Sequence, residues 1–405
     1  MDPNGTTVAE AERRRAKPSA PVVLANLVAR PVTVDLAGRT VPTWAFADVI
    51  GGPGLRAKAG DVLAVSFRNE LPVETTIHWH GIALRNDMDG VHDLTQLAVK
   101  PGATFEYRFT VADPGTYWFH PHTGLQLDRG LYSPLIIDDP ADPGAYDAES
   151  IIVLDDWLDG LAGRTPEMVF AKLKPAGGGI GDMSGMARSN LLGGDAGDAR
   201  YAMHLVNGRP PGDRPTFDVL PSGRLRLRVI NAGSDTAYRF CVGGHRMTVT
   251  HTDGFPVEVD TILIGMGERH DVVVTVRDGA WPFVALAEGK NDAAEAVIRT
   301  KGSIQTAPSW SSLGERAVAY SARSNGNDHD AAIEGADLDH VTGTRGLHDL
   351  VVADVHAHVT EVDVEENQVA RLQLIDRHSR KGTRLRAGVV DHGNARFGPR
   401  PLGQS

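Results

Sequence analysis

Two pairs of histidines, each with one residue between its members, are the residues of this chain whose types and spacing could do chemistry. The first pair is His78 and His80, and the second is His120 and His122. Side chains of a β-strand alternate between its faces, so both imidazoles of a pair on a strand point the same way. If the two strand ends lie side by side, four imidazoles converge on one small volume. Such a set suits Cu, Zn, Fe or Ni, whereas one pair alone is a weak signal because histidine is often an ordinary surface or core residue.

The segments around these pairs predict the strands that must position them. In residues 61–69, Leu63, Val65 and Phe67 share one face. A similar face is formed by Phe105, Tyr107 and Phe109. Proline and glycine separate such runs, as the short strands of a Greek-key sandwich require. We therefore predict an all-β fold built from tandem Greek-key β-sandwiches.

Shifts in composition along the chain predict four parts. Residues 1–19 are polar and charged, and we expect them to be disordered. The first β-domain covers residues 20–140, and the stretch rich in Asp, Pro and Gly at its end is the predicted linker. The second domain covers residues 141–304. Residues 305–405 combine mixed charge with few aromatic residues, which predicts a poorly ordered tail.

One strand of the second domain, residues 224–230, alternates arginines with aliphatic residues. We expect its two leucines and Val229 to face the core and its three arginines to form a solvated face of the sheet.

Composition limits the classes of function. The 405 residues include 45 glycines and 24 prolines, and 41% are hydrophobic, which suits two β-rich domains with real cores plus a tail. A net charge of −11 argues against general binding of nucleic acid. No apolar run approaches the roughly 18 residues of a membrane span. A single cysteine excludes an intrachain disulfide but does not fix the compartment.

The context of the two histidine pairs is similar to a known family. The segments at 76–82, 87–91, 114–122 and 130–137 resemble the first cupredoxin domain of multicopper oxidases, the laccase-like family, and the likeness covers about residues 20–140. Residues 207–211 and the region around 244–254 resemble the middle domain of three-domain members, which is usually free of copper.

This resemblance implies a role for each site residue. The two pairs would supply half of a trinuclear copper cluster, with His78 resembling the ligand of the type 2 copper. The other three, His80, His120 and His122, resemble ligands of the paired type 3 coppers. Asp89 matches an acidic residue that helps pass protons to reduced oxygen, although without the family it would be read as a turn residue before Gly90. Family members take single electrons at a type 1 copper and reduce dioxygen to water at the cluster.

The chain departs from the family in its C-terminal part. The motifs that supply the type 1 site and the other cluster histidines are absent, and the one cysteine, Cys241, has no histidine beside it. We interpret Cys241 as a small buried hydrophobic residue and assign no copper role to His245 or His251. Our hypothesis is that the C-terminal cupredoxin domain has been lost and that the tail is a replacement or an out-of-frame translation.

Two further sets of possible ligands carry less weight. Met183 and Met186 lie in a long loop rich in glycine, where thioethers could bind Cu(I) but are more often incidental. His356 and His358 form a third pair, but the tail gives them no matching context, and we interpret them as part of a solvated segment.

Three functions remain open at this stage. The first is a copper-dependent oxidase that acts on phenols or on ions such as Cu(I) or Fe(II), with dioxygen as acceptor and missing ligands supplied by a neighbouring subunit of a homo-oligomer. The second is a non-catalytic copper-binding protein or a degenerate remnant, and the third is a four-histidine zinc or iron site. A copper nitrite reductase is excluded because no cysteine precedes residue 241. Family members are mostly exported, yet no clear signal peptide is present.

Overall fold

The computed structural model describes residues 5–16, 19–142, 146–173, 187–251 and 257–313. All of these described residues belong to one compact unit. The predicted tail, the methionines at 183 and 186, and the histidines at 356 and 358 lie outside the described residues. The described strands confirm the prediction of an all-β chain with tandem sandwiches.

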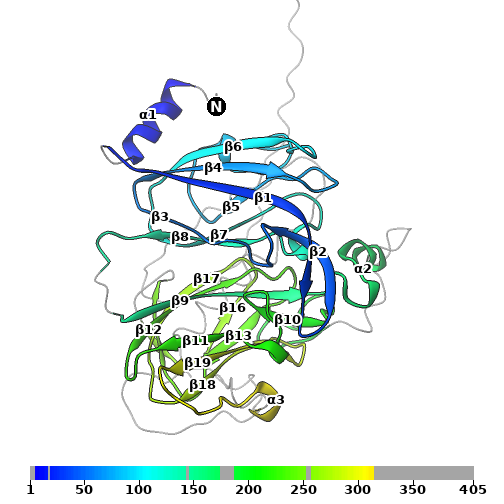
Figure 1. Cartoon of the computed structure of the whole chain (residues 1–405), viewed down its shortest axis with the longest axis vertical. Helices are drawn as coiled ribbons and strands as arrows, with labels where there is room; N and C mark the ends of the chain where they lie inside the picture. Colours follow the sequence, from blue (N-terminus) through cyan, green and yellow to red (C-terminus); the bar gives the residue numbers. More distant parts are fainter. Residues whose placement is uncertain (1–4, 17–18, 143–145, 174–186, 252–256, 314–405) are drawn as a thin grey trace, which may run out of the picture. The chain divides into compact units, whose positions relative to one another are not determined.

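The first domain consists of two four-stranded sheets (Figure 1). One sheet has, in spatial order, β2 (Thr40–Phe46), β1 (Val22–Asp35), β4 (Asp61–Asn69) and β6 (Thr104–Val111). The other has β3 (Leu55–Lys58), β8 (Ser133–Asp138), β7 (Gly115–His120) and β5 (His78–His80). Alternate side chains from both sheets fill the core between them, where Trp79 is fully buried among Tyr107, Phe109 and Phe119.

The second domain is a larger sandwich, with its strands green to yellow in Figure 1. Its six-stranded sheet has β10 (Met203–Val206), β9 (Ala148–Trp157), β12 (Arg224–Asn231), β17 (Arg269–Thr275), β14 (Met247–His251) and β15 (Val257–Val259). Its five-stranded sheet has β11 (Thr216–Val219), β19 (Asp292–Thr300), β18 (Ala280–Ala287), β13 (Tyr238–Val242) and β16 (Ile262–Ile264).

Short helices and 3₁₀ turns lie before, between and after the strands. The α-helices are α1 (Thr6–Arg15), α2 (Pro166–Leu173) and α3 (Trp310–Leu313). Single 3₁₀ turns are η1 (Asn86–Met88), η2 (Leu127–Arg129), η3 (Leu161–Gly163) and η5 (Pro211–Asp213).

We expected residues 1–19 to be disordered, and helix α1 corrects that expectation for residues 6–15. The sequence of the helix is rich in Ala, Glu and Arg, which favour helix. Its Glu12 carboxylate accepts a hydrogen bond of 3.0 Å from the backbone N–H of Thr110 on β6, and Arg15 donates to the carbonyl of Ala83 at 3.1 Å. These contacts with the first sandwich hold the helix in place, and they involve residues about 70 to 100 positions away that local composition does not reveal.

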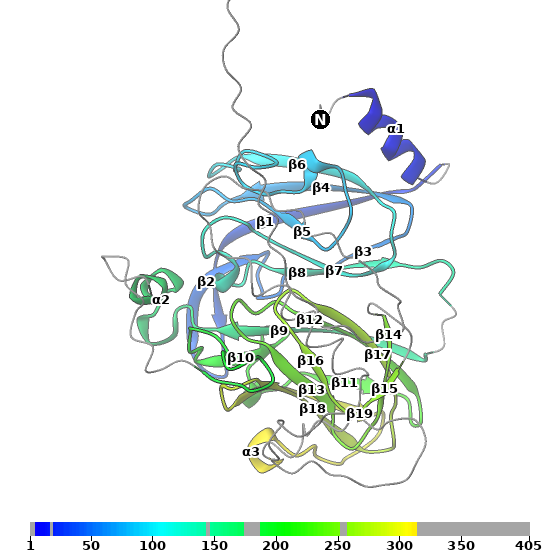
Figure 2. The same cartoon turned by 180° about the vertical axis from the view of Figure 1, so that it is seen from behind.

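A third hydrophobic core joins the two sandwiches. It combines side chains of the first domain, among them Ile50, Trp118 and Tyr132, with Val153 and Trp157 of the second. Strand β7, which carries Trp118, contacts β12 and β17 (Figure 2). The strand that carries His120, the first residue of the second histidine pair, is therefore packed directly against the second domain.

Two of the three arginines of β12 are buried, contrary to the expectation of a solvated face. Arg224 is exposed, but Arg226 and Arg228 are only 3% and 2% exposed, and both pair with the buried carboxylate of Asp271, at 2.6 and 3.1 Å. The Asp271 carboxylate also accepts a hydrogen bond of 2.6 Å from the hydroxyl of Thr116 on β7. The polar face of β12 therefore lies against the first domain. The alternation of arginines with aliphatic residues, which predicted a solvated face, marks an interface between domains.

Candidate metal centre

Pairing between β5 and β7 brings the two histidine pairs together. The strands are antiparallel, with His78 opposite His120 and His80 opposite Trp118. These four side chains share one face of the sheet, while Trp79 and Phe119 point to the core on the other. The sequence predicted that alternate side chains would place both imidazoles of a pair on one face of a strand. His78 and His80 on β5 are arranged in this way.

The imidazoles form a compact group. Donor atoms of His78, His80 and His120 all lie within 4.8 Å of one another. His122 follows β7 and is more exposed, with its ring centroid 4.5 Å from that of His78 and 5.0 Å from that of His120. All four predicted ligands thus lie in one cluster.

Backbone carbonyls determine which nitrogen of two of these rings is free. Nδ1 of His78 lies 2.8 Å from the carbonyl oxygen of Asp89, and Nδ1 of His120 lies 3.0 Å from that of Pro121. A carbonyl oxygen can only accept, so each Nδ1 carries a proton and donates it. Nε2 is then left as the electron-pair donor of both rings, which is the arrangement that metal-ligating histidines need.

His80 presents Nδ1 to the cluster, whereas His78 and His120 present Nε2. Its Nδ1 lies 3.3 Å from Nε2 of His120. Two nitrogens bound to one tetrahedral ion at about 2.0 Å would lie about 3.3 Å apart, so the separation already fits a shared ion.

Electrostatics favours neutral imidazoles here. Burial, together with the nearby rings of His80, His122 and His78, holds the pKa of His120 well below its usual value. Burial and His78 also lower the pKa of His122, and Asp89 opposes that shift. Neutral imidazole is the form that binds metal ions, so the site is prepared for a cation.

Asp89 lies beside this cluster, and its backbone contact was not foreseen. The side chain of Asp89 is 29% exposed, and its carboxylate lies 3.4 Å from Nδ1 of His78. The backbone carbonyl oxygen of Asp89 is closer to the same nitrogen, at 2.8 Å. The next residue, Gly90, has φ +81°, and a Cβ there would lie 1.8 Å from the carbonyl oxygen of Ile77. Only glycine lets the loop come close enough to β5 for the Asp89 carbonyl to reach His78.

Three residues near the cluster were missed in the sequence. The indole of Trp118 stacks on His120 with ring centroids 4.3 Å apart and lies 4.8 Å from His80. From the second domain, Gly267 and Arg269 contact His80 and Gly81. The alternation of strand side chains could have placed Trp118 beside the histidines, whereas no local signal links residues 267 and 269 to a pair of histidines about 190 positions earlier.

The remaining candidate ligands have other roles. Cys241 is 3% exposed in the core of the second domain, as expected, and burial raises the pKa of its thiol to about 12. Nδ1 of His245 donates to the carbonyl of Gly243, and its Nε2 accepts from the N–H of Arg277, so both its nitrogens are used. His251 is half-exposed beside Asp271, with Nδ1 3.6 Å from the carboxylate.

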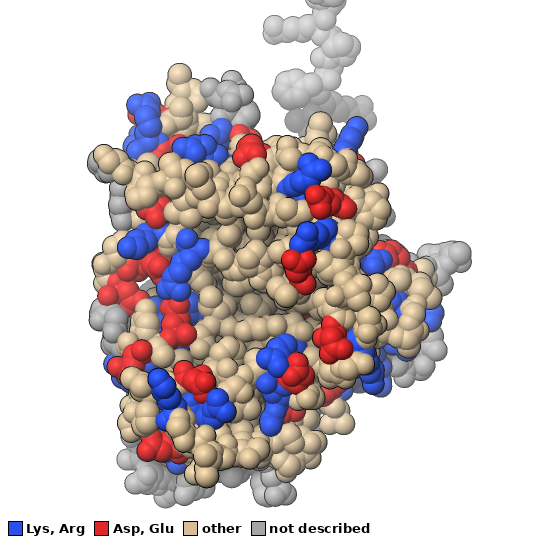
Figure 3. All heavy atoms as spheres, viewed as in Figure 1, with Lys and Arg blue, Asp and Glu red and all other residues tan. Residues whose placement is uncertain are grey.

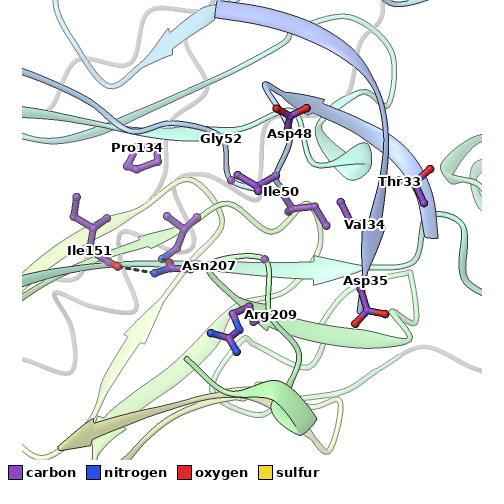
Figure 4. Close-up of a pocket in the computed structure, with 14 residues that line it drawn as sticks. Thr33, Val34, Asp35, Asp48, Ile50, Gly52, Pro134, Ile151, Asn207 and Arg209 are labelled. Carbon is purple, nitrogen blue, oxygen red and sulfur yellow. Dashed lines mark hydrogen bonds between the residues drawn. The ribbon is translucent and has the colours of Figure 1, made fainter. Parts of the chain in front are cut away.

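A cavity of about 610 Å³ lies between the domains, apart from the histidines. Figure 4 shows Ile50, Pro134 and Ile151 around it, with Asn207 donating to the carbonyl of Ile151 at 2.9 Å. The cavity is lined by no histidine or cysteine. Figure 3 shows acidic and basic side chains interspersed over one face of the molecule rather than gathered into a patch of either sign.

Comparison with known proteins agrees with this geometry. Models of the multicopper oxidase family match residues 29–142 and 182–303. The chain belongs to the multicopper oxidase family. A multicopper oxidase of Mycobacterium tuberculosis is 50% identical over 309 residues, which are 73% of this chain and 60% of that protein.

Other multicopper oxidase relatives give the same result. A copper resistance protein A homologue of Pseudomonas syringae is 32% identical, over 67% of this chain and 50% of its own length. The crystal structure of a multicopper oxidase from Pseudomonas thermotolerans superposes with a TM-score of 0.58 at 30% identity, over 70% of this chain and 65% of that one. The chain thus spans roughly half to two thirds of the length of these relatives.

None of the helices that the structure describes has the length and apolar character needed to span a bilayer.

Proposed function

We propose that this chain holds half of the oxygen-reducing copper cluster of a multicopper oxidase. The observation that carries the proposal is the convergence of donor atoms from His78, His80 and His120 within 4.8 Å, with backbone carbonyls that leave Nε2 of His78 and His120 as the electron-pair donor. Bound copper would carry electrons from a reductant to dioxygen, which is reduced to water.

The residues of the chain have distinct tasks in this proposal. His78 and His120 offer Nε2, His80 offers Nδ1, and His122 completes the half-cluster at its exposed side. We assign His78 to the type 2 copper and the other three to the type 3 pair, as the family resemblance implies. The part-exposed Asp89 carboxylate lies beside His78, where it can hold protons and pass them from solvent toward reduced oxygen.

The substrates and partners are part of the same proposal. The reductant is a phenol or a metal ion such as Cu(I) or Fe(II). The four histidines are half of a usual set, and the other cluster ligands would come from another subunit of a homo-oligomer. The electron-entry site needs a thiolate, and a second copy of this chain offers only Cys241, so this site would come from a different polypeptide. Export to an oxidising compartment is the localisation that we propose.

A second candidate is a copper-binding protein without oxidase activity. It is favoured by the position of Cys241, the one cysteine of the chain, whose thiol is buried in an apolar core rather than exposed beside histidines. A type 1 copper needs a thiolate ligand, and this thiol cannot serve as one where it lies.

Copper loading of the purified chain separates the two candidates. Metal content and oxygen consumption would be measured for the native chain, for His80→Ala and His122→Ala, and for a control, His92→Ala, which lies outside the cluster beside Asp93. Oxygen consumption that disappears in the first two variants and survives in the control supports the oxidase. Copper that is lost in the same variants, without any oxygen consumption, supports the second candidate. Zinc or iron bound in preference to copper would refute both.

A further inference from the structure

We infer that a turn of the second domain, residues 265–269, is a positioning element of the copper site and fixes Nδ1 of His80 as the atom that faces the metal. This inference rests on the proposed function. It gives a task at the metal site to a domain for which no copper ligand is proposed.

The decisive contact is between Gly267 and the His80 ring. Gly267 has φ +79°, and a Cβ on it would lie 2.9 Å from Cε1 and 3.2 Å from Nε2 of His80. Atoms that close essentially never occur, so the turn is in contact with the Cε1–Nε2 edge of the imidazole and has no room for a side chain. The second domain therefore occupies the space into which Nε2 would have to extend a metal bond.

Two more contacts hold the ring. Its Nδ1 lies 3.3 Å from Nε2 of His120, and its face lies 4.8 Å from the Trp118 ring at an angle of 31°. Rotation of the imidazole by half a turn about its bond to Cβ would move Nδ1 away from His120. With Gly267 on one edge and Trp118 on one face, the ring is held in the orientation that presents Nδ1.

The turn is stiff enough to act in this way. The N–H of Glu268 donates to the carbonyl of Gly265 at 3.2 Å, and the N–H of Gly265 donates to the Glu268 carboxylate at 2.6 Å. The N–H of Gly267 is bonded at 2.9 Å to the carbonyl of Asn231, a fully buried residue of β12. Backbone and side-chain bonds thus fix the turn to the second sandwich.

Arg269 connects this turn to the strand that carries His120. Its Nε donates to the carbonyl of Thr116 on β7 at 3.1 Å, and one terminal nitrogen donates to the carbonyl of Gly267 at 3.2 Å. The guanidinium also covers Gly81, where a Cβ would lie 2.7 Å from it. One side chain therefore sets the distance between Gly267 and the segment that bears the histidines.

Two glycine substitutions give a matched test. Gly267→Ala adds a methyl group against His80, whereas Gly102→Ala adds one at a nearly equal φ of +76° with no atom within 4 Å. Both variants carry the backbone strain of a left-handed alanine, so a difference between them isolates the contact. We would record the ring ¹⁵N resonances of His80 in metal-free protein, assigned by loss in His80→Gln, and Cu(I) affinity by competition with a chelator.

The expected result is a displaced His80 resonance and a 10- to 100-fold weaker Cu(I) affinity in Gly267→Ala, with Gly102→Ala like the native chain. Arg269→Gln, which removes the link without adding bulk, is expected to change both measurements in the same direction and carries the test if Gly267→Ala does not fold. Unchanged resonances and affinity in the folded variants would overturn the inference. If the native chain binds no copper, the proposed function fails, while the metal-free resonances still decide whether the turn positions His80.

Discussion

The carboxylate of Asp271 is expected to be among the most costly single groups to remove from this protein. It is 1% exposed and accepts hydrogen bonds from Arg226, Arg228 and Thr116. Replacing it by the similarly shaped asparagine removes the charge that compensates two buried guanidinium groups. Breaking a buried ion pair by removing one partner costs about 3–5 kcal/mol.

The structure places the expected value at the lower end of that range. Arg226 keeps a second carboxylate, that of Asp142 at 2.6 Å, and Arg228 keeps that of Glu149 at 2.7 Å. Neither guanidinium is left without a negative partner, so we expect Asp271→Asn to lower the free energy of unfolding by about 3 kcal/mol.

Urea unfolding of the metal-free chain measures this effect. The matched control is Asp218→Asn, the same change in an exposed pair with Arg299, where about 1 kcal/mol or less is expected. A loss for Asp271→Asn that is no larger than that of the control would refute the view that this buried network joins the domains.

Three other perturbations test separate parts of the structure. Gly90→Ala is expected to cost about 3 kcal/mol or more, because its Cβ would overlap the carbonyl of Ile77, and thermal unfolding beside Gly102→Ala would show it. Burial lowers the pKa of His204 to about 3, so the folded protein leaves the ring neutral while the unfolded chain protonates it below about pH 6.5. The free energy of unfolding therefore falls as the pH drops from about 6.5 toward 3. Between about pH 7 and pH 5, this loss should be about 2 kcal/mol smaller in His204→Gln than in the native chain. Equal losses in the two proteins, measured by urea unfolding, would contradict this. The buried thiol of Cys241 should react with a thiol reagent only as fast as the chain unfolds, and rapid labelling of the native protein would show that the thiol is accessible.

The histidine cluster could be predicted because it depends on a local rule. Side chains two apart on a strand share a face, so His78 and His80 had to point together wherever β5 lay. That the second pair would be paired with the first required the family resemblance, because strand order depends on contacts distant in sequence. The choice of nitrogen on the rings of His78 and His120 depends on the carbonyls of Asp89 and Pro121, which no pattern of residue types specifies.

The arginines of β12 show where such a rule fails. Alternation separates the two faces of a strand, but it does not distinguish a face against water from a face against another domain. Arg226 and Arg228 are buried because Thr116 of the first domain and Asp271 of the neighbouring strand meet them there. The contact of Gly267 with His80 was equally beyond reach, since it joins two domains through a turn without a side chain.

Helix α1 has a consequence for how copies of this protein behave together in solution. Strand β6 is the outer strand of its sheet, and an outer strand offers unpaired N–H and C=O groups to which another chain can add. Glu12 occupies one of these groups, the N–H of Thr110, with a charged side chain. The helix therefore reduces edge-to-edge aggregation through β6. A chain without residues 6–15 should scatter more light than the native chain as the protein concentration rises.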